Sequence, residues 1–395
     1  MSFATLPKAA SDAIKPYKIA ISPTKVATME LLVKSSPVGP ETFENKQMER
    51  NFGLTRDKFS ELKRKWVEEF KWEEQEKYLN AYPQFMAKIK DDDGREHDVH
   101  FMALFSQKAD AVPISFLHGW PGSFLEFVGL FEEFKNKYDN DPSKLPYHLI
   151  APSLPGFTLS SGPPVDRDWT EKDSARIINR LMHEIGFGSG YISQGGDIGS
   201  FVSQALAESY PECKAIHLNF LPGAPKKEVS LENISDAEKE GMQRIKDWQN
   251  TGAAYAREHG TRPSTIGLVL SSSPLALLAW IGEKFLEWTD TDPDDMETLR
   301  SVSLYWLTDS FPRCIYTYRD ATAHEHKFNQ PLGFSWFPKE LMPVPRVWIE
   351  AKANLVWFRA HEHGGHFAAL EHPKELAQDI EEFVAQVWST GRSNL

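Results

Sequence analysis

The segment GGDIG, residues 195–199, carries the sharpest signal for chemistry in the sequence. It stands between a short apolar run, expected to be a strand, and the helical pattern FVSQALAESY. A nucleophile on a strained strand-to-helix turn needs small residues two positions before and after it, because the backbone is crowded there. Gly195 and Gly199 meet this need around Asp197. An Asp between glycines is also often a turn residue or a helix cap, so the segment alone favours a nucleophile only slightly.

The segment HGWPG, residues 118–122, ends the apolar run VPISFLH and is the second signal. Where such an elbow exists, the loop after this strand supplies one backbone N–H of an oxyanion hole. Proline has no N–H to donate, so we expect Trp120 to provide it, together with Ile198, the residue after Asp197. The alternative is a plain Gly/Pro turn. His118 itself fits a structural, hydrogen-bonded histidine better than a catalyst.

The segment GGHF, residues 364–367, follows the apolar run NLVWFRAH and precedes the last helical pattern. This place suits the base of a hydrolase triad, whose order along the chain is nucleophile, acid, histidine. His366 is therefore the candidate base, and Glu340, just past the run PLGFSWF, is the candidate acid that orients it. A surface carboxylate is the alternative for Glu340. The neighbouring histidines raise a metal site, but HEHGGH lacks the spacing of the helical H-E-x-x-H site, so we expect no metal.

The arrangement of elements that must position these residues is an alternation of strands and helices. Short apolar runs occur at 98–105, 112–118, 147–154, 191–196 and 214–220, with helical patterns between them. This order predicts an α/β fold with a mostly parallel sheet covered on both faces. The pattern from 221 to 328 is almost entirely helical, and strand signals resume at 331–337 and 354–361.

Three units follow from these patterns. We expect an N-terminal extension over residues 1–95, a core built from 96–220 and 329–395, and a helical lid at 221–328 that covers the candidate site. Within the lid, Ser273 is expected to cap a helix that has Pro274 at its first position.

Composition and charge narrow the classes of partner. The formal charge of −12 disfavours nucleic acid, which needs a basic surface. No apolar run approaches the roughly 20 residues of a membrane-spanning helix, and the first residues lack the apolar stretch of a secretory signal. The 2 cysteines form no disulfide framework. We therefore expect a cytoplasmic protein without a membrane anchor, and a homodimer is left open.

With HGWPG, GGDIG, PKE and GGHF in this order, the chain resembles the epoxide hydrolases of the α/β-hydrolase superfamily, in particular the microsomal type and its soluble fungal relatives. The stretches PYKIAIS and WEEQEKYLNAYPQF resemble the N-terminal meander of that group. The resemblance implies an α/β-hydrolase fold with a lid inserted after the sixth strand. It also implies that an apolar epoxide is hydrolysed to a vicinal diol through an alkyl ester on Asp197, without a cofactor.

Members of that family carry two lid tyrosines that activate the epoxide oxygen. The matching segments here are GAAYAREHGTRPST, which gives Tyr255, and SFPRCIYTYRD, which gives Tyr318. Tyr316 is a rival, although residues two apart on a helix point about 200° apart, so at most one of this pair should face the pocket.

Two other functions stay open at this point. A haloalkane dehalogenase would use the same Asp and His and would hold the departing halide with N–H donors, for which Trp120 is suited. A catalytically silent hydrolase fold would bind a ligand without turnover. A serine esterase is disfavoured, because the apex of the elbow holds Asp197 and Ser200 lies one residue beyond the second glycine.

Overall fold

A computed structural model describes residues 2–47, 49, 52–319 and 326–391 of the chain. Its centre is one sheet of nine strands in the order β1-β2-β3-β5-β4-β6-β7-β8-β9. The strands are β1 (Ile14–Tyr17), β2 (Gln84–Lys90), β3 (Glu96–Leu104), β4 (Val112–Leu117), β5 (Tyr147–Pro152), β6 (Tyr191–Gly195), β7 (Cys213–Leu218), β8 (Leu332–Trp336) and β9 (Leu355–Ala360). The strands from β5 to β9 pair in parallel, while β1, β2 and β3 form an antiparallel edge that joins them through β5.

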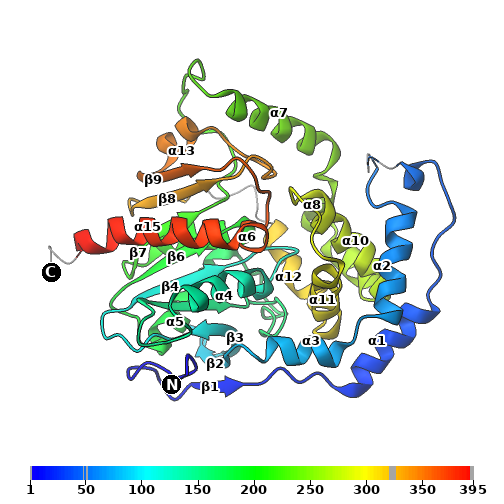
Figure 1. Cartoon of the computed structure of the whole chain (residues 1–395), viewed down its shortest axis with the longest axis horizontal. Coiled ribbons are helices and arrows are strands. Elements are labelled where there is room, and N and C mark those ends of the chain that lie inside the picture. The colour runs from blue at the N-terminus through cyan, green and yellow to red at the C-terminus, as the bar shows by residue number, and fades with distance from the viewer. Residues whose placement is uncertain (1, 48, 50–51, 320–325, 392–395) are drawn as a thin grey trace.

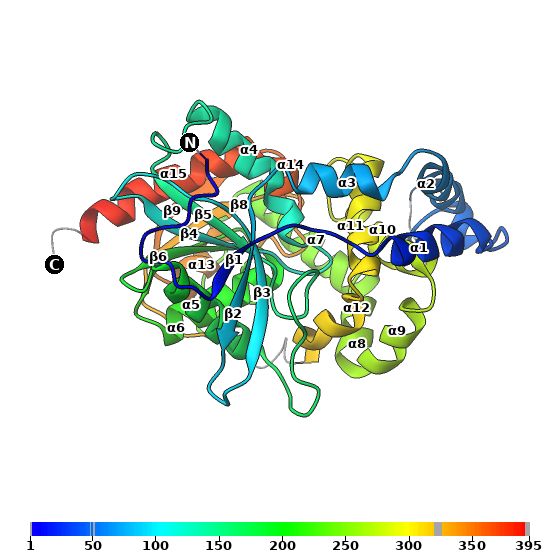
Figure 2. The same ribbon diagram turned by 90° about the horizontal axis from the view of Figure 1, so that it is seen from below.

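The helices that cover this sheet lie on both of its faces, as Figure 1 and Figure 2 show. Helices α4, α14 and α15 pack together on one face, and α5 packs beside α6 on the other. Every residue of β4 and β5 is buried, as expected for strands with both faces covered. The covering helices are α4 (Phe127–Lys137), α5 (Glu171–Ile185), α6 (Asp197–Ser209), α13 (Arg346–Lys352), α14 (Ala368–Glu371) and α15 (Pro373–Gly391), with a 3₁₀ turn, η2, at Phe124–Glu126.

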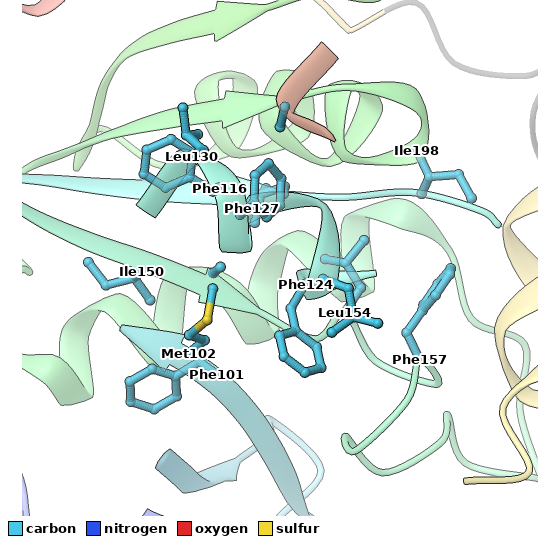
Figure 3. Packing of buried hydrophobic residues seen from close by; sticks show 14 of the residues in the cluster. Phe101, Met102, Phe116, Phe124, Phe127, Leu130, Ile150, Leu154, Phe157 and Ile198 are labelled. Carbon is cyan, nitrogen blue, oxygen red and sulfur yellow. The ribbon is translucent and has the colours of Figure 1, made fainter. Parts of the chain in front are cut away.

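Aromatic side chains fill the space between the central strands and α4. In Figure 3, Phe116 of β4 lies beside Phe127, and the two ring centroids are 5.6 Å apart. Phe131 approaches Phe116 at 5.4 Å from the next turn of the helix. Phe124, in the loop between β4 and α4, is fully buried. This packing anchors the loop that follows β4 against the sheet.

The segment between β7 and β8 is helical. It contains α7 (Asp236–Thr251), α8 (Ala254–Thr261), α9 (Pro263–Leu270), α10 (Pro274–Glu287), α11 (Asp295–Leu307), α12 (Phe311–Cys314) and the 3₁₀ helix η3 (Ile315–Arg319). The expected cap is present, because the Ser273 hydroxyl accepts a hydrogen bond from Ala276 N–H and Pro274 opens α10. The insertion follows the seventh strand of this chain rather than the sixth that the resemblance implies, because β1 and β2 precede the five predicted runs. Residues 320–325, which belong to the predicted lid, lie outside the described residues.

The N-terminal extension differs from the unit expected over residues 1–95. Strand β2 pairs along its whole length with β3, so a boundary at residue 95 would divide a hairpin of the central sheet. The remaining elements are α1 (Pro23–Ser35), the 3₁₀ turn η1 (Glu44–Lys46), α2 (Arg56–Glu68) and α3 (Trp72–Leu79). All three α-helices contact the inserted helices α10 or α11, and Figure 1 shows them beside that pair. The extension therefore joins the sheet to the outer side of the insertion.

Among the described residues, no single helix has the length and apolar composition needed to cross a membrane. Helices α9 and α10 meet that requirement only as a pair, bent by 115°.

Candidate active site

Asp197 stands on a strained turn between β6 and α6. Its φ of +46° lies in the left-handed region that L-residues rarely adopt. A Cβ atom at Gly195 would lie 2.3 Å from the carbonyl oxygen of Gly199, and one at Gly199 would lie 1.9 Å from that of Leu117. Both distances are far below van der Waals contact. The two glycines are therefore required by the backbone, as the spacing in the sequence predicted, and the turn presents the Asp197 carboxylate above the sheet.

The loop after β4 closes on the same carboxylate. Trp120 N–H donates a hydrogen bond of 2.8 Å to Asp197 Oδ1. The approach is so close that a Cβ atom at Gly119 would lie 2.0 Å from Oδ1. Ile198 N–H lies in the first turn of α6, where a helix offers its N–H groups no acceptor. In this structure the carboxylate binds Trp120 rather than Ile198, so the structure shows one of the two expected donors in contact.

The second oxygen of the carboxylate faces an imidazole. His366 Nε2 lies 3.4 Å from Asp197 Oδ2, and His366 Nδ1 donates to Glu340 Oε1 at 2.6 Å. Glu340 follows β8 and His366 follows β9, so both reach the carboxyl edge of the parallel sheet, where Asp197 also stands. The backbone N–H of His366 donates a hydrogen bond to the backbone carbonyl oxygen of Trp288 at 2.8 Å, which holds the residue in place. Glu340 keeps a proton on Nδ1 of the His366 ring, because Nδ1 must donate to the carboxylate. Nε2 is left facing Asp197.

Two phenols from the inserted helices lie over Trp120. Tyr255 of α8 stacks on the indole with ring centroids 5.2 Å apart, and Tyr318 of η3 meets it edge-on at 6.0 Å. The two tyrosine rings are 5.7 Å apart. Tyr318 Oη is buried and has no hydrogen-bond partner among the described residues. Burial first, and the charge of Asp197 among the further causes, raise the pKa of each hydroxyl well above its ordinary value. Both phenols are therefore neutral proton donors.

Tyr316 points elsewhere. Its hydroxyl lies 2.9 Å from Ser174 Oγ of α5 and donates to Pro155 O at 2.9 Å. These contacts occupy the hydroxyl in the packing between η3 and α5. Of the two rival tyrosines, the structure brings only Tyr318 to Trp120 and Tyr255.

Comparison with known proteins agrees with this arrangement. The sequence model described as the epoxide hydrolase N terminus matches residues 14–127, and the one described as the alpha/beta hydrolase fold matches 112–243. A putative epoxide hydrolase of Dothistroma septosporum is 44% identical over 393 residues, which cover 97% of this chain and 92% of that one. The chain belongs to the epoxide hydrolase family.

Solved structures of this family share the whole fold. The Aspergillus niger epoxide hydrolase superimposes with a TM-score of 0.94 at 50% identity, over 98% of this chain and 100% of that one. The juvenile hormone epoxide hydrolase of Bombyx mori superimposes with a TM-score of 0.83 at 25% identity, over 96% and 95% of the two chains. The family and the α/β-hydrolase fold expected from the ordered motifs are thus confirmed.

The charge on this epoxide hydrolase's histidine depends on its two carboxylate neighbours. Burial favours the neutral ring, yet Glu340 and Asp197 together raise the pKa of His366 well above its ordinary value. The charge of Asp197 therefore favours the protonated ring. An ester on Asp197 would remove that charge and with it part of the reason for protonation. The ring would then become a better base at the step that needs one.

Several residues around the site were missed from the sequence. His259 lies four positions after Tyr255, on the same side of α8, and its ring is 4.8 Å from that of Tyr318. Burial lowers the pKa of His259 to about 3, with Lys284 adding to the effect, so the ring is neutral. Trp288 meets the His366 ring edge-on at 5.1 Å. Helical spacing from Tyr255 could have indicated His259, whereas Trp288 and Lys284 reach the site only through helix packing.

The other histidines near the motifs have structural partners. His118 Nε2 accepts from Leu154 N–H at 3.1 Å, and burial lowers its pKa to about 4. His361 lies 2.7 Å from Asp379 and stacks on Phe337. In the part of the chain that the structure describes, no cluster of His, Cys, Asp and Glu is arranged to hold a metal ion.

Proposed function

We propose that this chain hydrolyses an apolar epoxide to a vicinal diol through an alkyl ester on Asp197. One observation carries the proposal: a single carboxylate has Oδ1 bound by Trp120 N–H and Oδ2 facing His366, and two neutral phenols pack on the ring of the same Trp120. The helical insertion, residues 221–328, acts as the lid that supplies the phenols. A cytoplasmic location and a homodimer stay predictions from the sequence.

In the first half of the reaction, Asp197 Oδ2 attacks a ring carbon of the epoxide. The carbon–oxygen bond of the ring breaks as the new ester bond forms, and Tyr255 and Tyr318 donate hydrogen bonds or a proton to the leaving oxygen. Positioned general acids of this kind contribute about 100- to 10,000-fold. A carboxylate suits this attack, because the resulting ester has an acyl carbon that water can reach, whereas a serine would leave a stable ether.

In the second half, His366 takes a proton from water, and the hydroxide attacks the acyl carbon of Asp197. The oxyanion develops on Oδ1, which Trp120 N–H already binds, and Ile198 N–H would join it there. Each such donor contributes roughly 3–4 kcal/mol. Glu340 stabilises the imidazolium that forms. As the intermediate collapses, the ester bond breaks and His366 gives its proton to the departing diol oxygen. Asp197 regains its carboxylate as the second proton of the water moves to the phenolate left by the first half.

The test follows the oxygen atoms through a single turnover. Excess enzyme, a styrene-type epoxide and water labelled with ¹⁸O should place the label in the peptide that contains Asp197, and the first diol formed should carry an unlabelled protein oxygen. His366→Gln should stop at the ester, visible as the mass of the substrate added to the same peptide. Label that appears in the first diol instead would show direct attack by water and would remove Asp197 as the nucleophile.

Two assays separate the alternatives. Halide release from a bromoalkane, with no diol from the epoxide, would identify a dehalogenase. Saturable binding of the epoxide without any product would identify a silent binding protein. Diol formation with Asp197→Ala as the inactive control supports the proposed hydrolase.

A further inference from the structure

A lysine ammonium is buried against the phenol of Tyr255. Lys284, on α10, has a side chain only 4% exposed. Its Nζ lies 4.9 Å from the centroid of the Tyr255 ring, 5.8 Å from that of Trp280 and 6.0 Å from that of Trp288. Nζ also pairs with the carboxylate of Glu283, its neighbour in the chain. Three aromatic rings and one carboxylate therefore surround the ammonium.

Packing alone does not account for a charge in this place. Taking an ammonium out of water costs several kcal/mol unless its surroundings compensate. An uncharged side chain of similar length, such as Met, would fill the same space between apolar neighbours without that cost. The ring faces recover part of the cost, because the negative face of an aromatic ring attracts a cation. The rings thus stabilise the ammonium, and the ammonium in turn stabilises negative charge on the rings.

The ammonium stabilises Tyr255 most, because the Tyr255 ring becomes more negative during the proposed reaction. In the proposed ring opening, the bond from Asp197 Oδ2 to carbon forms, the ring carbon–oxygen bond breaks, and the Tyr255 O–H proton moves to the released oxygen. The electron pair of that O–H bond stays on Tyr255. The phenolate is later neutralised by the second proton of the hydrolytic water, released as Asp197 regains its carboxylate. A cation over the ring face stabilises the phenolate more than the phenol.

Apart from Lys284, the surroundings of Tyr255 disfavour a negative charge on its phenol. Burial and then Asp197 raise the pKa of Tyr255, which makes its proton harder to release. His259, 5.4 Å from the Tyr255 ring, gives no positive charge, because it is neutral. Its Nε2 accepts a hydrogen bond from Trp280 Nε1 at 3.0 Å, and this bond orients the Trp280 ring that lies 5.8 Å from Lys284 Nζ. The ammonium is the positive charge that these surroundings present to Tyr255.

We propose that Lys284 is a positioning residue for the reaction, whose ammonium stabilises the negative charge on Tyr255 as that phenol protonates the epoxide oxygen. The inference rests on the proposed function. It assigns Lys284 to the alkylation half of the reaction alone, since Tyr255 donates its proton there. The hydrolysis of the ester, which His366 drives, should not depend on the ammonium.

The test measures the two halves separately in single turnovers. Lys284→Met should slow formation of the ester roughly 10-fold and leave its hydrolysis rate unchanged. Lys284→Arg, which keeps a cation over the ring, should restore most of the rate. Exposed Lys246 of α7 offers a matched control, and Lys246→Met should change neither rate. Lys284→Gln, which can still bind Glu283, provides a second neutral variant if the Met variant unfolds.

A double-mutant cycle shows whether the effect passes through Tyr255. In the Tyr255→Phe background, Lys284→Met should have no further effect on alkylation by the remaining phenol. An undiminished loss in that background, or wild-type alkylation by a folded Lys284→Met enzyme, would overturn the inference. A wild-type enzyme that forms no ester at all would instead contradict the proposed function, so the two failures are distinguishable.

Discussion

At the scale of single residues, the two carboxylate oxygens of Asp197 have different partners in the site. Asp197 Oδ1 is bound by Trp120 N–H, whereas Oδ2 lies 3.4 Å from His366 Nε2 and is the atom that attacks in the proposed reaction. The division makes the later oxyanion form on an atom that already has its donor. It requires the backbone of residue 119 to lie against the carboxylate, which only glycine permits.

Gly119→Ala tests this contact. The new methyl group would lie 2.0 Å from Asp197 Oδ1, so the carboxylate must leave Trp120 N–H or the loop must move. Loss of one oxyanion donor lowers kcat about 100- to 1,000-fold, and we expect a loss in this range with a melting temperature near that of the wild type. Gly39→Ala, where no atom lies within 4 Å of the new group, should leave kcat unchanged. A fully active Gly119→Ala enzyme would show that the Trp120 contact is dispensable.

The sequence predicted these residues because each stands in a short motif. The glycines of the elbow, the proline after Trp120 and the place of His366 after the last strand are all local features. The sequence could not predict Lys284 beside Tyr255. They belong to two helices whose packing brings them together, and their separation along the chain gives no sign of it.

At the scale of elements, η3 decides which tyrosine reaches the site. The sequence predicts that Tyr316 and Tyr318 diverge on an α-helix, whereas η3 is a 3₁₀ helix with three residues per turn. Residues two apart then differ by about 240°, so the conclusion is unchanged. The contacts agree, since Tyr316 binds α5 and Tyr318 packs on Tyr255.

Removing each hydroxyl in turn separates their roles. Tyr318→Phe removes a donor from the epoxide oxygen and should slow alkylation about 100-fold with little change in stability. Tyr316→Phe leaves the buried carbonyl of Pro155 without this donor and should lower the free energy of unfolding by about 1 kcal/mol. Its alkylation rate should stay within about 3-fold of the wild type, since it touches no reacting group. Rapid-mixing kinetics and urea unfolding measure the two quantities, and the reverse pattern would assign Tyr316 to the site.

At the scale of the whole molecule, the N-terminal extension adds strands to the sheet and also packs its helices against the insertion. The sequence failed to predict β1 because its four residues, IKPY, contain a proline and show no apolar alternation. It becomes a strand only by pairing with β2. After β1 the chain runs through α1, α2 and α3 along α10 and α11 before it returns to the sheet. The extension therefore packs against both the sheet and the insertion.

Asp295, at the start of α11, forms the ion pairs that join the insertion to α2 of the extension. Lys58 and Lys65, seven residues apart on one face of α2, reach its two oxygens at 2.8 and 2.5 Å. The Asp295 side chain is 8% exposed. Burial alone would raise the pKa of Asp295, but the two lysines hold it below its ordinary value. A carboxyl with a depressed pKa contributes stability above its unfolded-state pKa and loses it as the pH falls through the folded-state pKa.

Asp295→Asn should therefore lower the free energy of unfolding by roughly 1–3 kcal/mol at pH 7. The deficit should shrink as the pH falls below about 4, where the unfolded-state carboxylate begins to be protonated, and should vanish below the lower folded-state pKa. Asp309, which pairs with Lys25, is 71% exposed, and Asp309→Asn should cost less than about 1 kcal/mol because solvent screens that pair. Urea unfolding of the three proteins at pH 7 and at a pH about one unit below the unfolded-state pKa of about 4 measures these differences. Equal losses for the two variants at pH 7, or a deficit for Asp295→Asn that does not change with pH, would show that the contact between α2 and α11 depends on packing and not on this charge.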